Sequence, residues 1–461
     1  MKDQEAAFQE LKRSFLHFSV SGKPYLFHTP SFDLFELDSI AESVMGETTS
    51  SSPSQLSTSE WEALEELLGL NPSPSTTLHE VPLVRAISLE LNHVCNLRCQ
   101  YCYVFSKDQH QLPLDAPKQM KWETAKSVLD YFLSPLPQGS PFFIRLFGGE
   151  PLLSFPLIKK IVEYVDQCRE KKSLEIEYML ISNGTILNEE IEEFLKKHEV
   201  HLGFSIDGPS KQHDILRPTL AGKGSFEKIE MHRRKLASVQ ISNQPMANVV
   251  VNKKNPDMFE NFLSLRDQGY ESVHFNLIFT DNPDFQLDVQ DFPRLKAEYE
   301  KFKRYLLEDF PSRLPETPLI SDLYRRIIDG KKRTNYCGAG KEYLGVGMDG
   351  GFYPCHRFVG SPKFKLGDSS SGLSEELRSK FLLPHIESRP ICRACPVRTV
   401  CGGGCGHSNL LYRGSIEEPR ELFCLLKKWE VECALYLLIQ SQQGGRDETL
   451  EENKEAQKRS A

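Results

Sequence analysis

The spacing of apolar residues changes character at about residue 85. From there to about residue 280, short runs of apolar and β-branched residues alternate with stretches whose apolar residues recur every three or four positions. The short runs predict strands, and the longer periodic stretches predict helices. The predicted strands cover residues 85–91, 142–147, 176–182, 201–206, 246–251 and 272–278, and the predicted helices cover 122–133, 154–171, 188–198, 226–237 and 256–268.

This regular alternation predicts the fold class. Strands that alternate with helices form parallel β-α-β units with right-handed crossovers. Six such units are two fewer than a complete eight-fold barrel requires. We therefore predict an α/β fold, a partial and open TIM-like (β/α)6 barrel. A mostly helical stretch over 290–330 follows the last strand, so we assign residues 85–330 to this domain.

The segment before the barrel predicts a small separate unit. Residues 15–20 and 24–28 are typical of two strands, and Ser21-Gly22-Lys23 between them is a hairpin signal. The same region predicts helices over residues 4–14, 32–45 and 59–70, and a Ser- and Thr-rich linker over 46–57. Residues 1–84 are thus expected to form an N-terminal unit and its linker.

Composition and charge exclude several classes of protein. The 461 residues are 39% hydrophobic and 26% charged, and the net charge of −8 gives no general attraction to nucleic acid or anionic lipid. The first residues are charged and carry no apolar targeting segment. No apolar run reaches the roughly 18 residues of a membrane span. We expect a cytoplasmic protein with neither nucleic acid nor membrane as a partner.

Three of the twelve cysteines follow the first predicted strand of the barrel. Cys95, Cys99 and Cys102 form a C-x3-C-x2-C run directly after residues 85–91. In a chain without an export signal, cysteines are not expected to form a disulfide framework. Three thiolates on one loop suit an iron–sulfur cluster, because sulfur is its preferred ligand. They would leave one iron of a four-iron cluster open to a small molecule.

Seven further cysteines gather near the C-terminus. They give the pattern C-x12-G-x4-C and then C-x2-C-x5-C-x3-C followed by a last cysteine, and they are Cys337, Cys355, Cys392, Cys395, Cys401, Cys405 and Cys424. Paired zinc knuckles are an alternative use of such a set. Cys168 and Cys433 stand apart in helical patterns and are expected to be buried apolar residues. The polar stretch 442–461 predicts a disordered tail.

Polar motifs also follow the other predicted strands. Gly148-Gly149-Glu150 comes after the second strand, Asn183 after the third, and Ser205 and Asp207 lie at the end of the fourth. In barrels of this kind, reactive groups lie just beyond the C-terminal ends of the strands. These motifs and the cysteine loop are therefore expected to meet at one mouth.

These motifs together resemble the radical S-adenosyl-L-methionine (SAM) superfamily over residues 85–280. Its signature is the C-x3-C-x2-C loop with an aromatic residue, here Tyr101, before the third cysteine. The resemblance implies that Cys95, Cys99 and Cys102 hold a [4Fe–4S] cluster. Glycines allow a close backbone approach, and a carboxylate pairs with an ammonium group. The implied SAM contacts are Gly148, Gly149 and Glu150 to the methionine amino group, Asn183, Ser205 and Asp207 to ribose and methionine, and Arg217 to the methionine carboxylate.

The resemblance also implies a reaction. One electron from an external reductant of the flavodoxin or ferredoxin type would reduce the cluster, and reductive cleavage of SAM would give methionine and a 5′-deoxyadenosyl radical. That radical would abstract a hydrogen atom from the substrate. The protein's part in such chemistry is to orient the groups and to exclude water.

The C-terminal cysteines resemble a complete SPASM domain, over residues 331–441, that binds two auxiliary [4Fe–4S] clusters. The family pattern implies that Cys392, Cys395, Cys401 and Cys424 hold one cluster, and that Cys337, Cys355 and Cys405 hold the other. Tyr343 stands near the position where many relatives supply a fourth cysteine. With the cluster of the first loop, three [4Fe–4S] clusters are expected.

The SPASM resemblance implies a ribosomally made peptide or protein substrate with a leader segment. The N-terminal unit weakly resembles the winged-helix-like unit that binds such leaders, by strand addition to a sheet edge, although a fold-capping role is also open. Residues 353–360 and 364–368 resemble the thioether-forming maturases. Residues 25–30 and 34–38 resemble the maturase of quinohemoprotein amine dehydrogenase.

Two other functions stay open. Anaerobic sulfatase-maturating enzymes share both cysteine regions, but they lack a long N-terminal unit and have Asp where this chain has His356. A non-catalytic iron–sulfur electron carrier or scaffold is the alternative of another class. The Gly-Gly-Glu motif, Asn183 and Arg217 favour an enzyme, because a carrier needs no SAM site.

Overall fold

The computed structural model describes residues 14–37, 82–104, 118–238, 245–316, 318–383 and 385–444. The predicted helices over 4–14 and 59–70, the linker over 46–57 and the tail from 442 lie almost entirely outside these residues. None of the described helices has the length and apolar character needed to cross a membrane.

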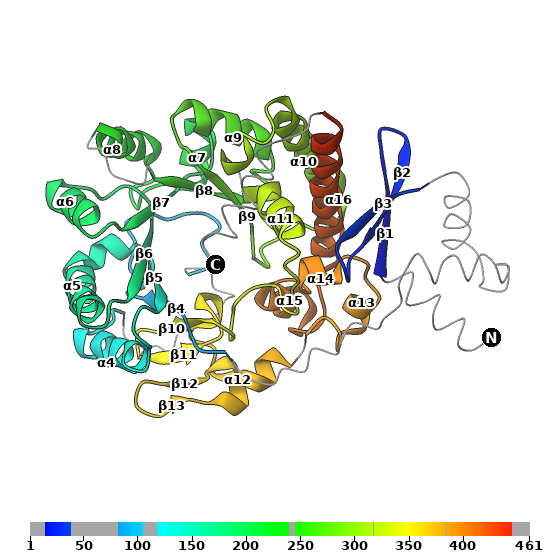
Figure 1. Ribbon diagram of the computed structural model, residues 1–461. Helices are drawn as coiled ribbons and strands as arrows, with labels where there is room; N and C mark the ends of the chain where they lie inside the picture. Colours follow the sequence, from blue (N-terminus) through cyan, green and yellow to red (C-terminus); the bar gives the residue numbers. More distant parts are fainter. Residues whose placement is uncertain are drawn as a thin grey trace.

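A curved sheet of parallel strands forms the centre of the protein (Figure 1). Neighbouring strands pair in sequence order and in parallel, as predicted for an open barrel. Each lies within one residue of its predicted position. The six strands are β4 (Ala86–Glu90), β5 (Pro141–Phe147), β6 (Glu175–Ser182), β7 (His201–Ser205), β8 (Met246–Val251) and β9 (Val273–Leu277).

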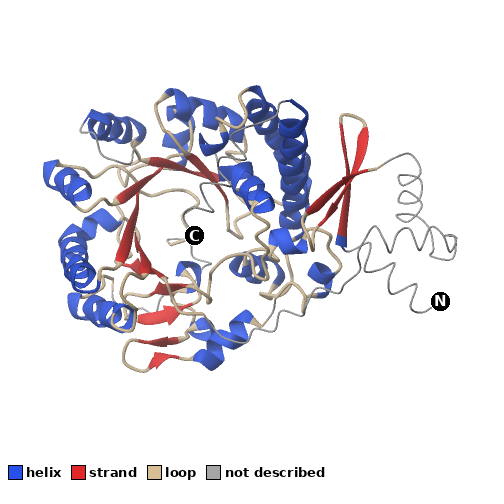
Figure 2. Cartoon of the chain, viewed as in Figure 1, coloured by secondary structure: helices blue, strands red, loops and turns tan. Residues whose placement is uncertain are grey.

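Helices cover the outer face of this sheet, so that strands lie inside and helices outside (Figure 2). The five predicted helices are confirmed as α4 (Trp122–Leu133), α5 (Phe155–Lys172), α6 (Glu189–Lys197), α8 (Phe226–Ser238) and α9 (Met258–Asp267). Their buried apolar residues face the strands, as the helical spacing predicts. The short helix α7 (Ser210–Leu216) after β7 was not predicted.

The C-terminal region continues the same sheet, which the sequence did not predict. Strand β10 (Tyr343–Val346) pairs in parallel with β4, although about 250 residues separate them in the chain. Strands β11 (Gly351–Tyr353), β12 (Gly367–Asp368) and β13 (Gly372–Leu373) follow as antiparallel neighbours. The boundary expected at residue 330 therefore does not separate two sheets, and Cys355 lies close to the barrel strands.

Short helical elements complete the C-terminal half. Two longer helices, α10 (Phe292–Glu308) and α11 (Pro318–Ile328), pack against the last helix, α16 (Glu421–Gly444). The remaining helices are α12 (Glu375–Leu382), α13 (Pro390–Arg393), α14 (Arg398–Cys401) and α15 (Gly406–Arg413), and the 3-10 turns are η2 (Pro151–Ser154), η3 (Val289–Asp291), η4 (Leu314–Glu316), η5 (His356–Phe358) and η6 (Pro362–Phe364).

The N-terminal unit is a three-stranded antiparallel sheet, in the order β1 (Phe15–Val20), β2 (Lys23–His28) and β3 (Asp33–Glu36). The predicted hairpin is confirmed. The helix predicted over 32–45 is wrong at residues 33–36, because their backbone pairs with β2, and the rest of it lies outside the described residues. The sheet lies beside α16 (Figure 1), and Thr399 of α14 donates to the Thr29 carbonyl at 2.8 Å.

Phe352 of β11 joins the C-terminal region to the barrel. Its side chain is fully buried, and its ring centroid lies 5.2 Å and 4.9 Å from those of Tyr131 and Phe132 on α4. Aromatic rings at these separations bury a large apolar area and attract one another by their edges and faces.

We predict that Phe352→Ala lowers the free energy of unfolding by about 3–5 kcal/mol, because it opens a cavity at this joint. Urea unfolding of the cluster-free protein measures the change. Leu263→Ala, at a side chain that is 39% exposed on α9, is the control and should change stability far less. Equal losses in the two variants would show that Phe352 does not join the two regions.

Candidate active site

The loop that carries Cys95, Cys99 and Cys102 is held first by the end of strand β5. The pairing of β4 with β5 continues beyond both strands, because Gly149 N donates to Asn92 O and Glu150 N donates to Val94 O, each at 2.8 Å. A Cβ at Gly149 would lie 2.4 Å from Val94 O, and one at Gly148 would lie 2.7 Å from Asn92 O. The two glycines therefore let the cysteine loop approach β5. From the sequence, these glycines were expected to allow a close approach of the backbone to SAM.

Glu150 is fully buried beneath this loop. Its Oε1 accepts from Leu152 N at 3.0 Å and from Ser182 Oγ at 2.9 Å, and its Oε2 accepts from Asn183 N at 2.7 Å. Burial raises the pKa of Glu150 to about 7, although these three donors act to lower it. All three donors are neutral, and a carboxylate has about four acceptor positions. A ligand ammonium group would fit the remaining position and stabilise the charged form.

The end of strand β6 holds the first cysteine. Asn183 Nδ2 donates to Asn96 Oδ1 at 2.8 Å and lies 3.6 Å from Cys95 Sγ. Asn96 in turn donates to Thr185 Oγ1 at 2.8 Å. Thr185 and Asn96 were not among the predicted site residues, because neither type is distinctive in a sequence. Asn183 thus lies next to the predicted cluster ligand.

Asp207 connects the cysteine loop to strand β8. Its buried carboxylate accepts from Tyr101 Oη, from Arg217 Nε at 2.8 Å and Nη2 at 3.4 Å, and from Val250 N at 3.0 Å. These four bonds use the acceptor positions of a carboxylate. Asp207 thus orients Tyr101 and Arg217, and its expected contact with SAM stays a prediction.

Arg217 completes this side of the site. Its Nη1 lies 3.9 Å from Cys99 Sγ, and its guanidinium carbon lies 5.3 Å from the centroid of the Tyr101 ring. The segment after α7 also pairs with the loop, since Arg98 N donates to Pro218 O and Gln100 N donates to Leu216 O. Ser205 is half-buried at the end of β7, in register with Asn248. The predicted convergence of strand-end motifs on one loop is therefore present.

The three thiols of the loop lie close enough to influence one another. Burial raises the pKa of Cys95, and it raises that of Cys99 to about 12, although the Arg217 guanidinium acts to lower it. In the described part of the chain, no three His, Cys, Asp or Glu side chains surround a single ion position.

Four of the C-terminal cysteines line one cavity of about 110 Å³. Cys392, Cys395, Cys401 and Cys424 come from α13, the turn after it, α14 and α16, and Arg398 and Lys427 also line the cavity. Burial first, and then the other three thiols, raise the pKa of Cys424 to about 12. Thiolates form at such sites when metal replaces their protons. The family pattern implies these four cysteines as one ligand set, and that role stays a prediction.

Cys337, Cys355 and Cys405 form a second group beside the barrel. Burial raises the pKa of Cys355 to about 12, and the Cys405 and Cys337 thiols contribute to the rise. The Tyr343 hydroxyl lies 3.0 Å from His356 Nδ1 in a hydrogen bond. Burial lowers the pKa of His356 well below its usual value, so its imidazole is neutral. Cys433 is buried in the apolar core, as expected, whereas Cys168 is only partly buried and packs against that core.

Comparison with known proteins agrees with this geometry. The family model described as the Radical SAM superfamily matches residues 89–266. An uncharacterised protein of Methanocaldococcus jannaschii is 32% identical over 308 residues, which are 66% of this chain and 94% of that protein. The cysteine-type anaerobic sulfatase-maturating enzyme of Clostridium perfringens is 25% identical (68% and 85% covered), and the subtilosin biosynthesis protein AlbA of Bacillus subtilis is also 25% identical (70% and 68%).

Solved structures show the same fold. Native anSMEcpe with bound AdoMet aligns with a TM-score of 0.65 at 21% identity, over 78% of this chain and 99% of that one. Streptococcus suis SuiB bound to precursor peptide SuiA aligns with a TM-score of 0.52 at 16% identity, over 89% and 98%. The chain belongs to the radical SAM superfamily. It is an enzyme, and its superfamily uses a [4Fe–4S] cluster together with SAM.

We predict that Asp207→Asn lowers the free energy of unfolding by about 3–5 kcal/mol, because it leaves the buried Arg217 guanidinium without a counter-charge. Urea unfolding of the cluster-free protein measures this loss. Asp257→Asn, which breaks the exposed pair with Arg294, is the matched control and should cost less than about 1 kcal/mol. A small loss at Asp207 would mean that the pair does not hold the cysteine loop.

Proposed function

We propose that this enzyme modifies a ribosomally made peptide or protein and joins a cysteine sulfur to a carbon atom of its substrate. The observation that carries the proposal is the presence of two further cysteine groups, one around a single cavity and one beside the barrel interior. Relatives with named roles include AlbA, in the biosynthesis of the bacteriocin subtilosin, and a solved neighbour, SuiB, binds a precursor peptide.

Different residues of the mouth suit different chemical groups of SAM. Glu150 has the buried carboxylate and the one remaining acceptor position that suit the methionine amino group. Arg217, whose Nη1 faces the cysteine loop, suits the methionine carboxylate, while Asn183 and Ser205 suit the ribose. Asp207 fixes the orientation of Arg217. When bound, the cluster and SAM supply the 5′-deoxyadenosyl radical, and the buried walls of the mouth keep water from it.

We further propose three clusters, held by the ligand sets that the sequence predicted. Cys95, Cys99 and Cys102 hold the cluster at the mouth. Cys392, Cys395, Cys401 and Cys424 hold one auxiliary cluster. The other is held by Cys337, Cys355 and Cys405, which leaves one iron without a cysteine from this chain. That iron suits a substrate thiolate, as thioether formation requires.

The N-terminal sheet suits a leader peptide. Strand β3 pairs with β2 on one side, and its other edge is an outer edge of the three-stranded sheet. Extended peptides add to such edges through main-chain hydrogen bonds. Because the sheet packs on α16, which carries Cys424, a leader on this edge would be held next to the cysteine-rich region. We also propose a flavodoxin- or ferredoxin-type protein as the electron donor.

A second candidate is the oxidation of a serine or cysteine to formylglycine. The match to the sulfatase-maturating enzyme of Clostridium perfringens covers 85% of that enzyme, and this favours the formylglycine reaction. Against it stands His356, neutral and hydrogen-bonded to Tyr343, in the place of the aspartate expected for that reaction. The product distinguishes the two candidates.

Iron content tests the three ligand sets. Anaerobic reconstitution should load roughly twelve irons per chain, and Cys424→Ala should lower the number to about eight. Cys168→Ala, at a half-buried cysteine that belongs to no group, is the control and should keep the full number. About four irons in the unsubstituted protein, or zinc in their place, would contradict the two auxiliary clusters.

Mass spectrometry of a co-expressed candidate peptide tests the reaction. We predict 5′-deoxyadenosine formation under reducing conditions, together with a peptide product that is lighter by two hydrogen atoms and resists thiol alkylation. The mass change of formylglycine would support the second candidate instead. No 5′-deoxyadenosine from a fully loaded enzyme would contradict both candidates.

A further inference from the structure

Exposed apolar side chains gather around the first cysteine loop. Of the eleven large apolar side chains that are exposed among the described residues, four lie on this loop or on the segments beside it. They are between 42% and 59% exposed, and they are Val94, Leu153, Ile215 and Leu220. A group of exposed apolar side chains on one part of a surface is typical of a contact site for another molecule.

Hydrogen bonds hold two of these side chains on one side of the loop. Glu150 N donates to Val94 O at 2.8 Å, and Leu153 N donates to Glu150 O at 3.1 Å. The segment before α4 also lies here, since His93 N donates to Lys118 O at 3.1 Å. The exposed Lys118 therefore belongs to the same side.

The other two apolar side chains adjoin the loop through α7 and the segment after it. Gln100 Nε2 donates to Ile215 O at 2.7 Å. Leu97 forms an isolated antiparallel bridge with Thr219, the residue before Leu220. The three thiols of the loop are half-buried, so the loop does not seal them from the surface. We call the surface formed by the loop and the four apolar side chains the loop face.

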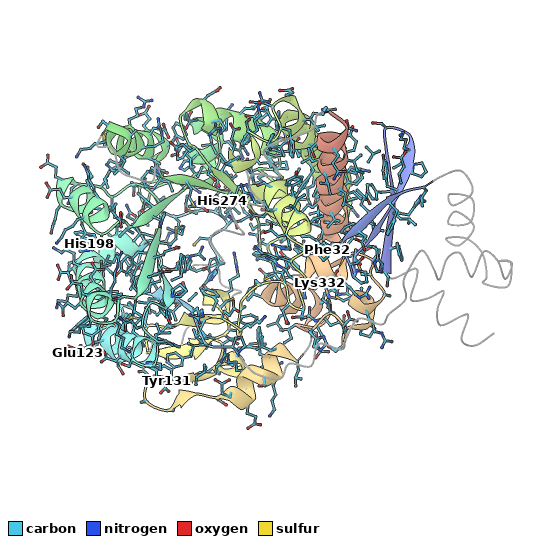
Figure 3. All side chains as sticks on the ribbon, in the orientation of Figure 1. Phe32, Glu123, Tyr131, His198, His274 and Lys332 are labelled. Atoms are coloured by element: carbon cyan, nitrogen blue, oxygen red, sulfur yellow. The ribbon has the colours of Figure 1, made fainter. Side chains whose placement is uncertain are left out.

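The exposed charges of the loop face are cationic. Lys118, Lys211 and Lys223 are exposed, and none of them pairs with an acid among the described residues. Asp214, whose Oδ1 accepts from two backbone amides at the start of α8, is the one acid in the described loop and its flanking segments, residues 92–104, 118–122, 151–155 and 210–224. The next acid, Glu123, lies at the outer edge of the helix layer (Figure 3). This face therefore favours a partner with a negatively charged surface.

A second group of exposed apolar side chains lies near the C-terminal cysteines, on α12, α13 and the segment between them. Its members are Leu377, Leu383 and Ile391. The exposed charged residues around it have both signs, and they are Lys380, Arg393, Glu375, Glu376 and Glu387. Like charges repel an acidic partner there, so such a partner is attracted more strongly to the loop face.

We infer that an acidic electron-carrier protein docks on the loop face and delivers its electron first to the loop of Cys95, Cys99 and Cys102. The inference rests on the proposed function, because it takes the proposed type of electron donor and adds where that donor binds. In the transfer from a flavodoxin, the anionic flavin hydroquinone loses one electron and becomes the neutral semiquinone, without releasing a proton. The [4Fe–4S] cluster of the loop gains that electron and passes from the 2+ to the 1+ state.

A small apolar centre within a charged rim suits this kind of partner. Complexes that transfer electrons are short-lived and bury little surface, so the donor can leave after each transfer. The charges of the rim mainly raise the rate of association, and salt weakens their effect. The rate of reduction should therefore depend on Lys211 and Lys223, although neither side chain takes part in holding SAM.

Stopped-flow oxidation of flavodoxin hydroquinone by the fully loaded, SAM-bound enzyme tests this surface. The second-order rate should fall as NaCl is added, because salt screens the lysines. Lys211→Glu combined with Lys223→Glu should lower the rate at low salt by at least about tenfold. Lys332→Glu combined with Arg393→Glu changes the net charge equally at exposed positions near the C-terminal cysteines, and should leave the rate within about twofold (Figure 3 labels Lys332).

Three results would overturn the inference. The first is an unchanged rate in the variant with both Lys211 and Lys223 replaced. The second is a rate that falls in the control pair alone, which would place electron entry at the C-terminal cysteines. The third is a flavodoxin that stays reduced beside an enzyme that dithionite reduces.

Calorimetric binding of oxidised flavodoxin tests the apolar centre. Ile215→Ser combined with Leu220→Ser should weaken binding at least about fivefold, because less apolar area is buried. Met231→Ser, at a side chain that is 56% exposed on α8, is the control and should bind normally. Unchanged binding in the first variant would contradict the inference. A dimer in sedimentation that these two substitutions dissociate would assign the face to a second copy of the chain, and would also overturn it.

Dithionite separates failure here from failure of the proposed function. With dithionite in place of flavodoxin, every variant should form 5′-deoxyadenosine at the rate of the unsubstituted enzyme. A loss in the variant of Lys211 and Lys223 would assign these lysines to the SAM site and overturn the docking surface. If the unsubstituted enzyme forms no 5′-deoxyadenosine with dithionite, the proposed function fails, and the flavodoxin measurements still decide the docking surface.

Discussion

Two buried carboxylates hold a loop that has almost no regular structure of its own. The Glu150 carboxylate accepts hydrogen bonds from its own turn and from the end of β6. The Asp207 carboxylate accepts hydrogen bonds from Tyr101 and Arg217. Removing either carboxylate from water is costly, so each needs its full set of partners. Those partners bring four strand ends to one point. The positions of the three thiols therefore depend on ionic groups that never touch them.

Much of this arrangement follows from the sequence. The strands and helices of the barrel were predicted within a few residues, because the spacing of apolar residues differs between buried strands and the helices that cover them. The site motifs were located because parallel strands bring their ends to one edge of a sheet. The grouping of Cys392, Cys395, Cys401 and Cys424 rested on a family pattern, and the shared cavity agrees with it.

Other features depend on contacts between distant parts of the chain. The pairing of β10 with β4 cannot be read from either segment, since both are short and apolar. The apolar residues in and around 33–36 are compatible with either a helix or a strand. The segment forms a strand because its backbone pairs with the edge of β2. The two glycines before Glu150 were assigned to ligand approach, whereas their nearest neighbours are backbone atoms of the cysteine loop.

The addition of β10 to the sheet also determines how the two cysteine regions face each other. It brings Cys355, His356 and Arg357 to the edge where the first cysteine loop begins, and the Arg357 guanidinium carbon lies 5.1 Å from the ring centroid of Tyr103, the residue after Cys102. One continuous sheet thus supports the mouth and the second cysteine group.

The central claim is that the loop of Cys95, Cys99 and Cys102 holds a cluster whose fourth iron binds SAM. Electron paramagnetic resonance of the reduced, fully loaded enzyme, recorded with and without SAM, tests it most directly. SAM should change the signal of one cluster and leave the others unaltered, and the variant with all three cysteines replaced by alanine should lose the SAM-dependent part alone. A spectrum that SAM does not alter, or a SAM response that survives in that variant, would contradict the claim.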